Sequence, residues 1–281
     1  MKKHKICKIL LVILAIFLCV AFYELLGICV AYKKQPEVSN TTKKETKNGS
    51  WNECSENTER AVIIEKNPEA LLQRVRLIKN AKKEIILSTF AFQSDESGKL
   101  ILGALHDAAD RGVHIRLLVD GMESWIDMEG NPYFYGLSSH ENVEIKLYNK
   151  ANPLKPWKMM GRMHDKYLIA DGKRYILGGR NTYNYFLGDF PGHKNYDRDV
   201  LVVCDEPEKE NSVNQLLEYF ETIWEQEDSD YFHDNKKLAN RKSVKNAVLE
   251  LQNGYQKYFE ENKERICDTD YTDETFETEK I

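Results

Sequence analysis

The stretch "MHDKYLIADGKRYILGGRN", Met163 to Asn181, predicts a β-hairpin. Two apolar segments, "KYLIAD" and "RYILGG", flank a Gly172-Lys173 or an Asp171-Gly172 loop, and a DG pair between such segments is a tight-turn signal. Successive side chains of a strand point to opposite faces, so both loops put the same residues on one face. The hairpin is therefore expected to gather His164, Lys166, Gly179 and Asn181 on one face and to pack its other face into the core.

This set of side chains suits phosphodiester displacement. A neutral imidazole such as that of His164 can attack phosphorus. An ammonium and an amide, here Lys166 and Asn181, can stabilise the charge that builds on the non-bridging oxygens. A glycine beside them, Gly179, lets a phosphate approach the backbone closely. The leaving alcohol also needs a proton from a second acid. No cofactor is expected, and no acidic cluster predicts a metal site.

The spacing H-x-K-x4-D-x6-G-G-x-N resembles the signature of the phospholipase D superfamily. The stretch is most similar to the first half of the cardiolipin synthase-like branch, and the likeness extends from about Asn67 to Trp224. The resemblance implies that His164 is catalytic, that Lys166 and Asn181 bind phosphate, and that Asp171 supports the site. For Asp171, a structural role in the turn is an equally good interpretation.

A second carboxylate is expected to orient the catalytic histidine, as in relatives of this superfamily. In "NYDRDVLVV" the better match is Asp197, with Asp199 as the alternative. Such a pair fixes the imidazole tautomer and stabilises the imidazolium. The spacing alone does not separate Asp197 from an ordinary surface carboxylate.

Strand and helix patterns alternate along the middle of the chain. Buried strands are predicted at 84–92, 113–120, 143–148 and 199–204, and helices with an apolar stripe are predicted between and after them. Repeated strand–helix–strand units favour an α/β fold, with helices on both sides of a mostly parallel sheet. The resemblance implies the α-β-α sandwich of the phospholipase D fold, with a mixed, mostly parallel sheet.

The chain ends differ from this middle part. Residues 1–32 combine a basic start with an apolar run long enough to cross a bilayer, which needs about 20 residues. No small-x-small cleavage site is evident, so an uncleaved single-pass anchor in the cell membrane is expected, with its orientation open. Residues 33–60 are expected to form a polar tether, 61–228 the catalytic half-domain, and 229–281 a polar C-terminal segment.

The chain has one such motif, whereas the superfamily usually brings two together. A second half is therefore expected as a partner: a second copy about a two-fold axis, a separate chain, or a segment beyond Ile281. Six cysteines, three of them in the apolar N-terminal run, form neither a disulfide framework nor a zinc spacing.

Three functions are compatible with these features. The leading hypothesis is a membrane-anchored phosphatidyltransferase or phospholipase that acts on glycerophospholipids through a phosphohistidine. The basic, aromatic stretch "NKANPLKPWKMMGR" before the motif suits anionic headgroups. The alternatives are a homodimeric phosphodiesterase or nuclease and a non-catalytic half-domain. A net charge of −5 and the anchor weigh against nucleic acid as a partner.

Overall fold

A mixed β-sheet organises the computed structural model, which describes residues 2–33, 40, 43–44, 59–158, 160–204, 206, 211–233, 236–272 and 276–277. The chain divides into two compact units, one formed by residues 1–52 and 151–162 and the other by residues 53–150 and 163–281. The predicted tether, 33–60, lies almost entirely outside the described residues.

In the first unit, helix α1 (Lys2–Lys33) carries the apolar run. Its segment from Lys5 to Lys33 contains an 18-residue window with a mean hydropathy of 2.9 and is long and apolar enough to cross a membrane. The same unit contains the loop 151–162, which includes the 3₁₀ turn η1 (Pro156–Lys158).

In the second unit, the described residues form one sheet in the order β8-β4-β3-β2-β5-β6-β7-β1-β9. Its strands are β1 (Glu59–Ile64), β2 (Glu84–Thr89), β3 (His114–Asp120), β4 (Val143–Tyr148), β5 (Lys166–Ala170), β6 (Arg174–Gly178), β7 (Asp199–Cys204), β8 (Ser229–Tyr231) and β9 (Phe276–Glu277).

The predicted mixed α/β sheet is confirmed, but most of its neighbouring strands run antiparallel. Only β2–β3 and β3–β4 are parallel pairs in the described sheet. The strand β5 enters beside β2 in the opposite direction, and β6 and β7 continue the antiparallel order. The reason is local, because tight turns such as the one from β5 to β6 reverse the chain, whereas a parallel pair needs a long crossover.

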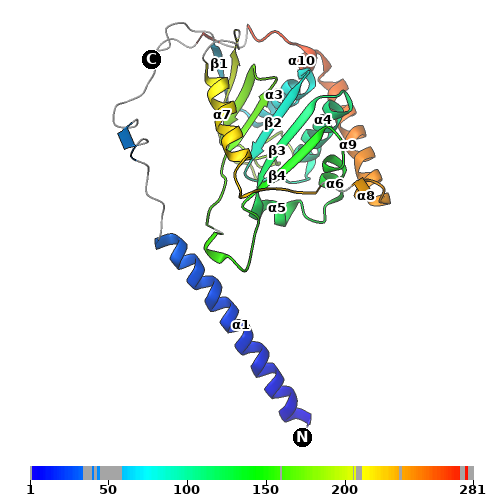
Figure 1. The fold of residues 1–281 in the computed structure, drawn as a ribbon. Helices are drawn as coiled ribbons and strands as arrows, with labels where there is room; N and C mark the ends of the chain where they lie inside the picture. Colours follow the sequence, from blue (N-terminus) through cyan, green and yellow to red (C-terminus); the bar gives the residue numbers. More distant parts are fainter. Residues whose placement is uncertain are drawn as a thin grey trace. The chain divides into compact units, whose positions relative to one another are not determined.

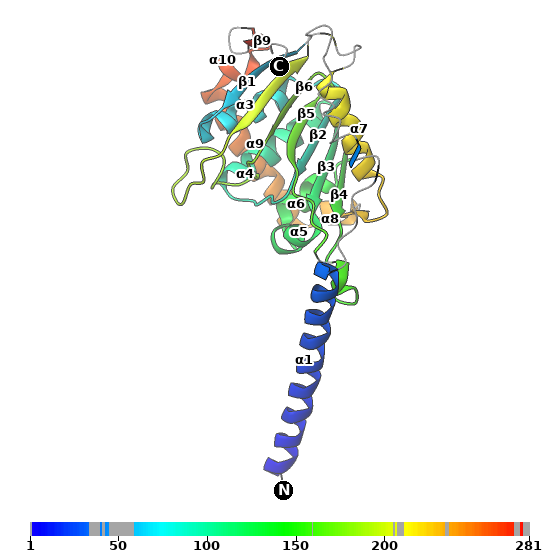
Figure 2. The same cartoon turned by 90° about the vertical axis from the view of Figure 1, so that its left-hand side faces the viewer.

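Helices cover both faces of this sheet (Figures 1 and 2). They are α3 (Asn67–Asn80), α4 (Glu96–Asp110), α5 (Gly121–Asp127), α6 (Pro132–Ser138), α7 (Ser212–Trp224), α8 (Lys236–Ala239), α9 (Lys242–Glu261) and α10 (Lys263–Cys267). The helices α3, α4, α6 and α9 pack over one apolar cluster, and α7 packs over a second cluster on the other face through Val213, Phe220 and Trp224.

The C-terminal segment, 229–281, was expected to be polar, and its described residues supply part of the packed core. Helix α9 buries Val244, Leu251, Tyr255 and Phe259 against α4 and α6. Together with the buried Ala247, these side chains recur at intervals of three or four residues, so the helix presents one apolar face despite its many charged residues. The described part of this segment therefore belongs to the same core as the motif.

Candidate active site

The predicted hairpin is present, but its register differs by one residue from either predicted loop. Strands β5 and β6 pair Ala170 with Arg174, which leaves a three-residue turn at 171–173. Asp171 and Gly172 both have positive φ, at 55° and 62°. The shift places Gly178, rather than Gly179 or Leu177, across from Lys166. The expectation that strand pairing alone puts Gly179 and Asn181 on the face of Lys166 is therefore wrong.

The motif side chains nevertheless converge, because β6 ends at Gly178 and the chain turns toward β2. The ring of Phe90, just after β2, lies 4.6 Å from the imidazole of His164. The Lys166 Nζ lies 5.4 Å from the centre of the same ring. The Asn181 side-chain oxygen accepts a hydrogen bond of 3.3 Å from the backbone N–H of Ala91. Contacts with Phe90 and Ala91 thus place His164, Lys166 and Asn181 together at the carboxyl end of β2.

His164 and its neighbours differ in their access to solvent. His164 is exposed, whereas Lys166 and Asn181 are buried. The Lys166 ammonium donates a hydrogen bond of 2.7 Å to the carbonyl of His164, which fixes its position beside the imidazole. The imidazole is therefore accessible to a large substrate, while the groups that would bind phosphate are already held in place.

The chain segment that leads into the motif is held by Asp120, the last residue of β3. Its carboxylate accepts the N–H groups of Met122 and Glu123 and so caps α5. The second oxygen accepts the N–H of Met163 at 3.1 Å. One buried carboxylate therefore joins the carboxyl end of a parallel strand to the residue before His164, at the sheet edge where ligands of α/β folds commonly bind. Asp120 and Phe90 were not among the predicted site residues, although both lie within predicted strands, at or near their carboxyl ends.

The two glycines of the motif are explained by the carboxylates that lie over them. A Cβ on Gly178 would lie 2.0 Å from an oxygen of Asp199, and a Cβ on Gly179 would lie 2.0 Å from an oxygen of Asp197. The predicted open glycine surface is therefore occupied by side chains of the segment that leads into β7. Glycine is still required because another group lies close to the backbone, but that group is an aspartate of the protein rather than a bound phosphate.

Asp197 and Asp199 have different surroundings. Asp199 is fully buried and pairs with Arg74 at 2.9 Å and with Arg180 at 3.2 Å. Burial lowers the pKa of Arg180, and the charge of Asp199 opposes that shift. Asp197 is half-buried and accepts the N–H of Arg198. Asp199 is thus committed to a structural ion pair, and Asp197 stays the better candidate to orient a histidine. No hydrogen bond joins it to His164 within the described part of the chain.

Asp171 lies at the other end of β5 from Lys166. Its carboxylate accepts the backbone N–H groups of Lys82, Lys83 and Glu84 at the start of β2, at distances of 2.7–3.1 Å. Five residues of extended chain separate it from Lys166, or about 16 Å. The structure therefore does not bring Asp171 to the other motif residues, and its contacts favour the turn interpretation.

Asp171→Ala tests this structural role. We expect the free energy of unfolding to fall by about 1–3 kcal/mol, because three backbone donors lose their partner. The turnover number per folded molecule should not change. Urea denaturation and phosphodiesterase kinetics of one preparation measure both quantities. A loss of turnover without a loss in the free energy of unfolding would instead assign Asp171 a catalytic role.

Burial lowers the pKa of Lys166 from its ordinary value of 10.5, and the nearby Asp165 and Asp197 oppose the shift. The ammonium therefore loses its proton at a lower pH than an exposed lysine does. If the charged form binds the phosphate, activity should decline below pH 10.5 as the pH rises. Lys166→Arg should move this decline to higher pH, since guanidinium stays protonated. An unchanged pH profile of kcat/KM in Lys166→Arg would exclude the assignment.

Lys166→Ala should reduce kcat by about 10²–10³-fold, or about 2.7–4 kcal/mol, which is the usual effect of losing one donor to a developing oxyanion. Steady-state kinetics with a chromogenic phosphodiester measure this loss. Lys173→Ala is the matched control, because Lys173 is an exposed lysine in the turn of the same hairpin. A similar loss in both variants would contradict a specific role for Lys166.

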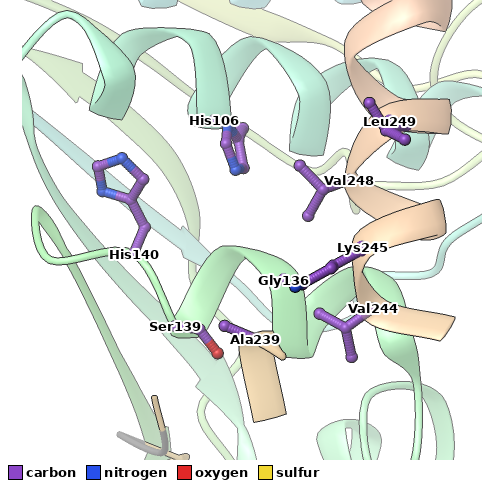
Figure 3. A pocket seen from close by; sticks show the side chains of 9 residues that line it. All are labelled: His106, Gly136, Ser139, His140, Ala239, Val244, Lys245, Val248 and Leu249. Atoms are coloured by element: carbon purple, nitrogen blue, oxygen red, sulfur yellow. The ribbon is translucent and has the colours of Figure 1, made fainter. Parts of the chain in front are cut away.

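A cavity of about 460 Å³ lies apart from these residues, between α4, α6, α8 and α9 (Figure 3). His106 and His140 face it, together with Val244, Lys245 and Val248. The carboxylate of Asp110 lies 3.0 Å from Nδ1 of His106 and 3.3 Å from Nε2 of His140. The His140 contact joins the segment after α6 to α4, the His106 contact lies within α4, and no motif residue lines this cavity.

Comparison with known proteins is consistent with this geometry. The family described as "Cardiolipin synthase, PLD-like domain" matches residues 74–224. An uncharacterized protein of Helicobacter pylori strain J99 is 30% identical over 212 residues, which cover 70% of this chain and 39% of that protein. Cardiolipin synthase C of Escherichia coli K12 is 29% identical over 171 residues, which cover 56% of this chain and 34% of the synthase. The chain thus spans about two fifths or less of the length of these relatives.

Among solved structures, phosphatidylserine synthase of Haemophilus influenzae superposes with a TM-score of 0.52 and 18% sequence identity. The superposition covers 79% of this chain and 48% of the synthase. At this identity the likeness shows a shared fold. It supports the predicted α-β-α architecture, whereas the chemistry has to be argued from the residues of the candidate site.

Proposed function

Because the chain belongs to the family of cardiolipin synthase, PLD-like domains, we propose that it cleaves or transfers a phosphodiester of a glycerophospholipid through His164. The observation that carries this proposal is the convergence of His164, Lys166 and Asn181 around Phe90 and Ala91. An accessible imidazole beside a buried ammonium and a buried amide can attack a phosphate and stabilise the resulting charge.

The proposed reaction has two steps. One imidazole nitrogen of His164 forms a bond to phosphorus while the bond to the leaving alcohol oxygen breaks. A second acid gives that oxygen its proton. Water or a lipid alcohol then attacks the phosphohistidine, loses its own proton to the same group, and releases His164. Lys166 and Asn181 bind the non-bridging oxygens in both steps, and Asp197 stabilises the imidazolium.

The second acid is proposed to come from a second motif of the same kind, on another copy of this chain, on a different polypeptide or on a segment beyond Ile281. The described chain carries one histidine with the required lysine two residues later. His164 is exposed, so a partner half can approach it without any disruption of the sheet. Light scattering together with a phosphodiesterase assay on residues 1–281 tests this point, because an active monomer of these residues would contradict it.

Helix α1 is proposed to stay in the mature protein as a single-pass anchor in the cell membrane. Its length and mean hydropathy satisfy the requirement for a membrane span. An anchor keeps the second unit near a bilayer, which favours a lipid over a soluble phosphodiester. The net charge of −5 also disfavours nucleic acid, whose binding depends on neutralising phosphates with cations.

A direct comparison of substrates tests the function. The full chain would be reconstituted into vesicles and supplied with labelled phosphatidylglycerol or, separately, with single-stranded DNA. We expect headgroup release or transfer to a lipid alcohol, and we expect the His164→Ala protein to show neither. DNA cleavage with inert lipid would support the nuclease alternative. Inactivity toward both substrates at any oligomeric state would support a non-catalytic half-domain.

A further inference from the structure

The loop 151–162, which we call the interface loop, is packed against α1 within the first unit. The hydroxyl of Tyr23 donates a hydrogen bond of 3.0 Å to the carbonyl of Leu154. Gly27 is buried under Pro156, and a Cβ added to Gly27 would lie 2.4 Å from the Pro156 ring. The helix and the loop therefore approach so closely that only glycine fits at this point.

This contact uses one face of the helix. Gly27 is buried, and its neighbours on that face, Glu24, Ile28 and Ala31, are half-buried, whereas the preceding apolar turns are exposed. The spacing i, i+3, i+4, i+7 puts these four residues on a single stripe. The interface loop is also held by its own backbone, because Lys155, Lys158 and Gly161 each donate an N–H to the carbonyl three residues earlier. It is thus an ordered turn that docks on the helix.

The docked stripe lies where α1 would leave the bilayer. An apolar core of about 30 Å takes about 20 helical residues. Counted from Ile9, directly after the basic start, such a span ends near Ile28. The backbone of Trp157, which lies beside Gly27, is then at the boundary between hydrocarbon and headgroups, the depth that amphipathic aromatic side chains prefer. Tyr23 lies about 7 Å further into the bilayer.

The composition of the interface loop fits an anionic headgroup layer. It contains Lys155, Lys158 and Arg162 and no acidic residue. Between these cations, Leu154, Trp157 and Met160 expose apolar surface. Cations that alternate with exposed apolar groups bind bilayers that carry negative lipids, because the apolar groups enter the interface while the cations meet phosphates.

From these contacts we infer that α1 and the interface loop together form a binding site for the headgroups of anionic phospholipids at the bilayer surface. The inference deepens the proposed function and rests on it for one consequence only. Lys158 precedes His164 by six residues, so a headgroup bound there is within about 20 Å of the histidine along the chain. The site would then select anionic lipids and supply them to the motif.

Fluorescence of Trp157 tests the inference without using activity. The full chain would be reconstituted into vesicles of phosphatidylcholine and phosphatidylglycerol, with bromine on the acyl chains of either lipid in equal amount. The contribution of Trp157 is the quenching that disappears in Trp157→Phe. We expect it to be several-fold larger with brominated phosphatidylglycerol, and we expect Lys155→Glu/Lys158→Glu to abolish the difference.

Gly27→Leu tests the docking itself. The larger side chain should displace the interface loop, so quenching of Trp157 should fall with both lipids while α1 stays inserted. Ala21→Leu is the matched control, because Ala21 is exposed on the same helix. Equal quenching by the two brominated lipids would overturn the headgroup site, and normal quenching in Gly27→Leu would overturn the docking. The same measurement in His164→Ala separates these outcomes from a failure of the proposed function.

Discussion

The His164→Ala protein is expected to fold normally and to lose its phosphodiester activity by a factor of about 10⁴ or more, the range seen when a nucleophile or its proton-transfer role is removed. The His164 side chain is exposed, and its ring packs edge-on against the ring of Phe90. Little packing is therefore lost with the imidazole. Turnover of labelled phospholipid and the urea unfolding curve of the same sample measure the two effects.

The control for this variant is His193→Ala. His193 is also exposed and contacts a neighbouring side chain, Asn195, at 2.9 Å. It should keep wild-type turnover. A His164→Ala protein with substantial turnover, measured in an assembly whose partner motif is unchanged, would remove the central role assigned to His164.

Asp199→Ala should produce the largest loss of stability, about 3–5 kcal/mol in the free energy of unfolding, which is typical of removing one partner from a buried ion pair. Asp199 faces Arg74 and Arg180, and all three side chains are nearly inaccessible to water. The variant would leave two buried guanidinium groups without their carboxylate. Chemical denaturation of the full chain in detergent, followed by far-UV circular dichroism, measures the change.

Asp197→Ala is the informative comparison, because the two aspartates lie two residues apart and differ in burial. Asp197 is half-buried and faces the motif over Gly179. Its removal should lower turnover and leave the unfolding free energy nearly unchanged. If the two variants exchanged these effects, Asp199 would become the residue that orients the histidine.

Much of the candidate site could be predicted from local sequence. The DG turn located the hairpin, and the residue spacing within it identified His164, Lys166 and Asn181. The register could not be predicted, because it depends on positive φ at both Asp171 and Gly172 and on the contacts of Asp171 with the start of β2. The reason for Gly178 and Gly179 could not be predicted either, because it depends on how β7 and the residues before it lie beside β6.

The misjudged parts of the fold have different causes. The spacing of apolar residues in α9 was readable from the sequence, but the charged residues around them led to the prediction of a polar segment without a helix. The pairing of Arg74 with Asp199 spans 125 positions in the chain. No local pattern specifies a contact at such a separation. Sequence periodicity predicted the elements, whereas the partners of buried charges became visible only in three dimensions.

The direction of β1 has a mechanical consequence. The register pairs Glu59 with Cys204 and Ile64 with Asp199, so the strand enters the sheet at the end remote from the motif. Tension that reaches the domain through the residues before Glu59 would load that remote end first. Fraying would begin at the Cys204 end of β7 and would have to pass five residue pairs before it reached the pair of Ile64 with Asp199. The pairing of β1 with β7 therefore separates a load applied at Glu59 from the end of the sheet that carries the candidate site.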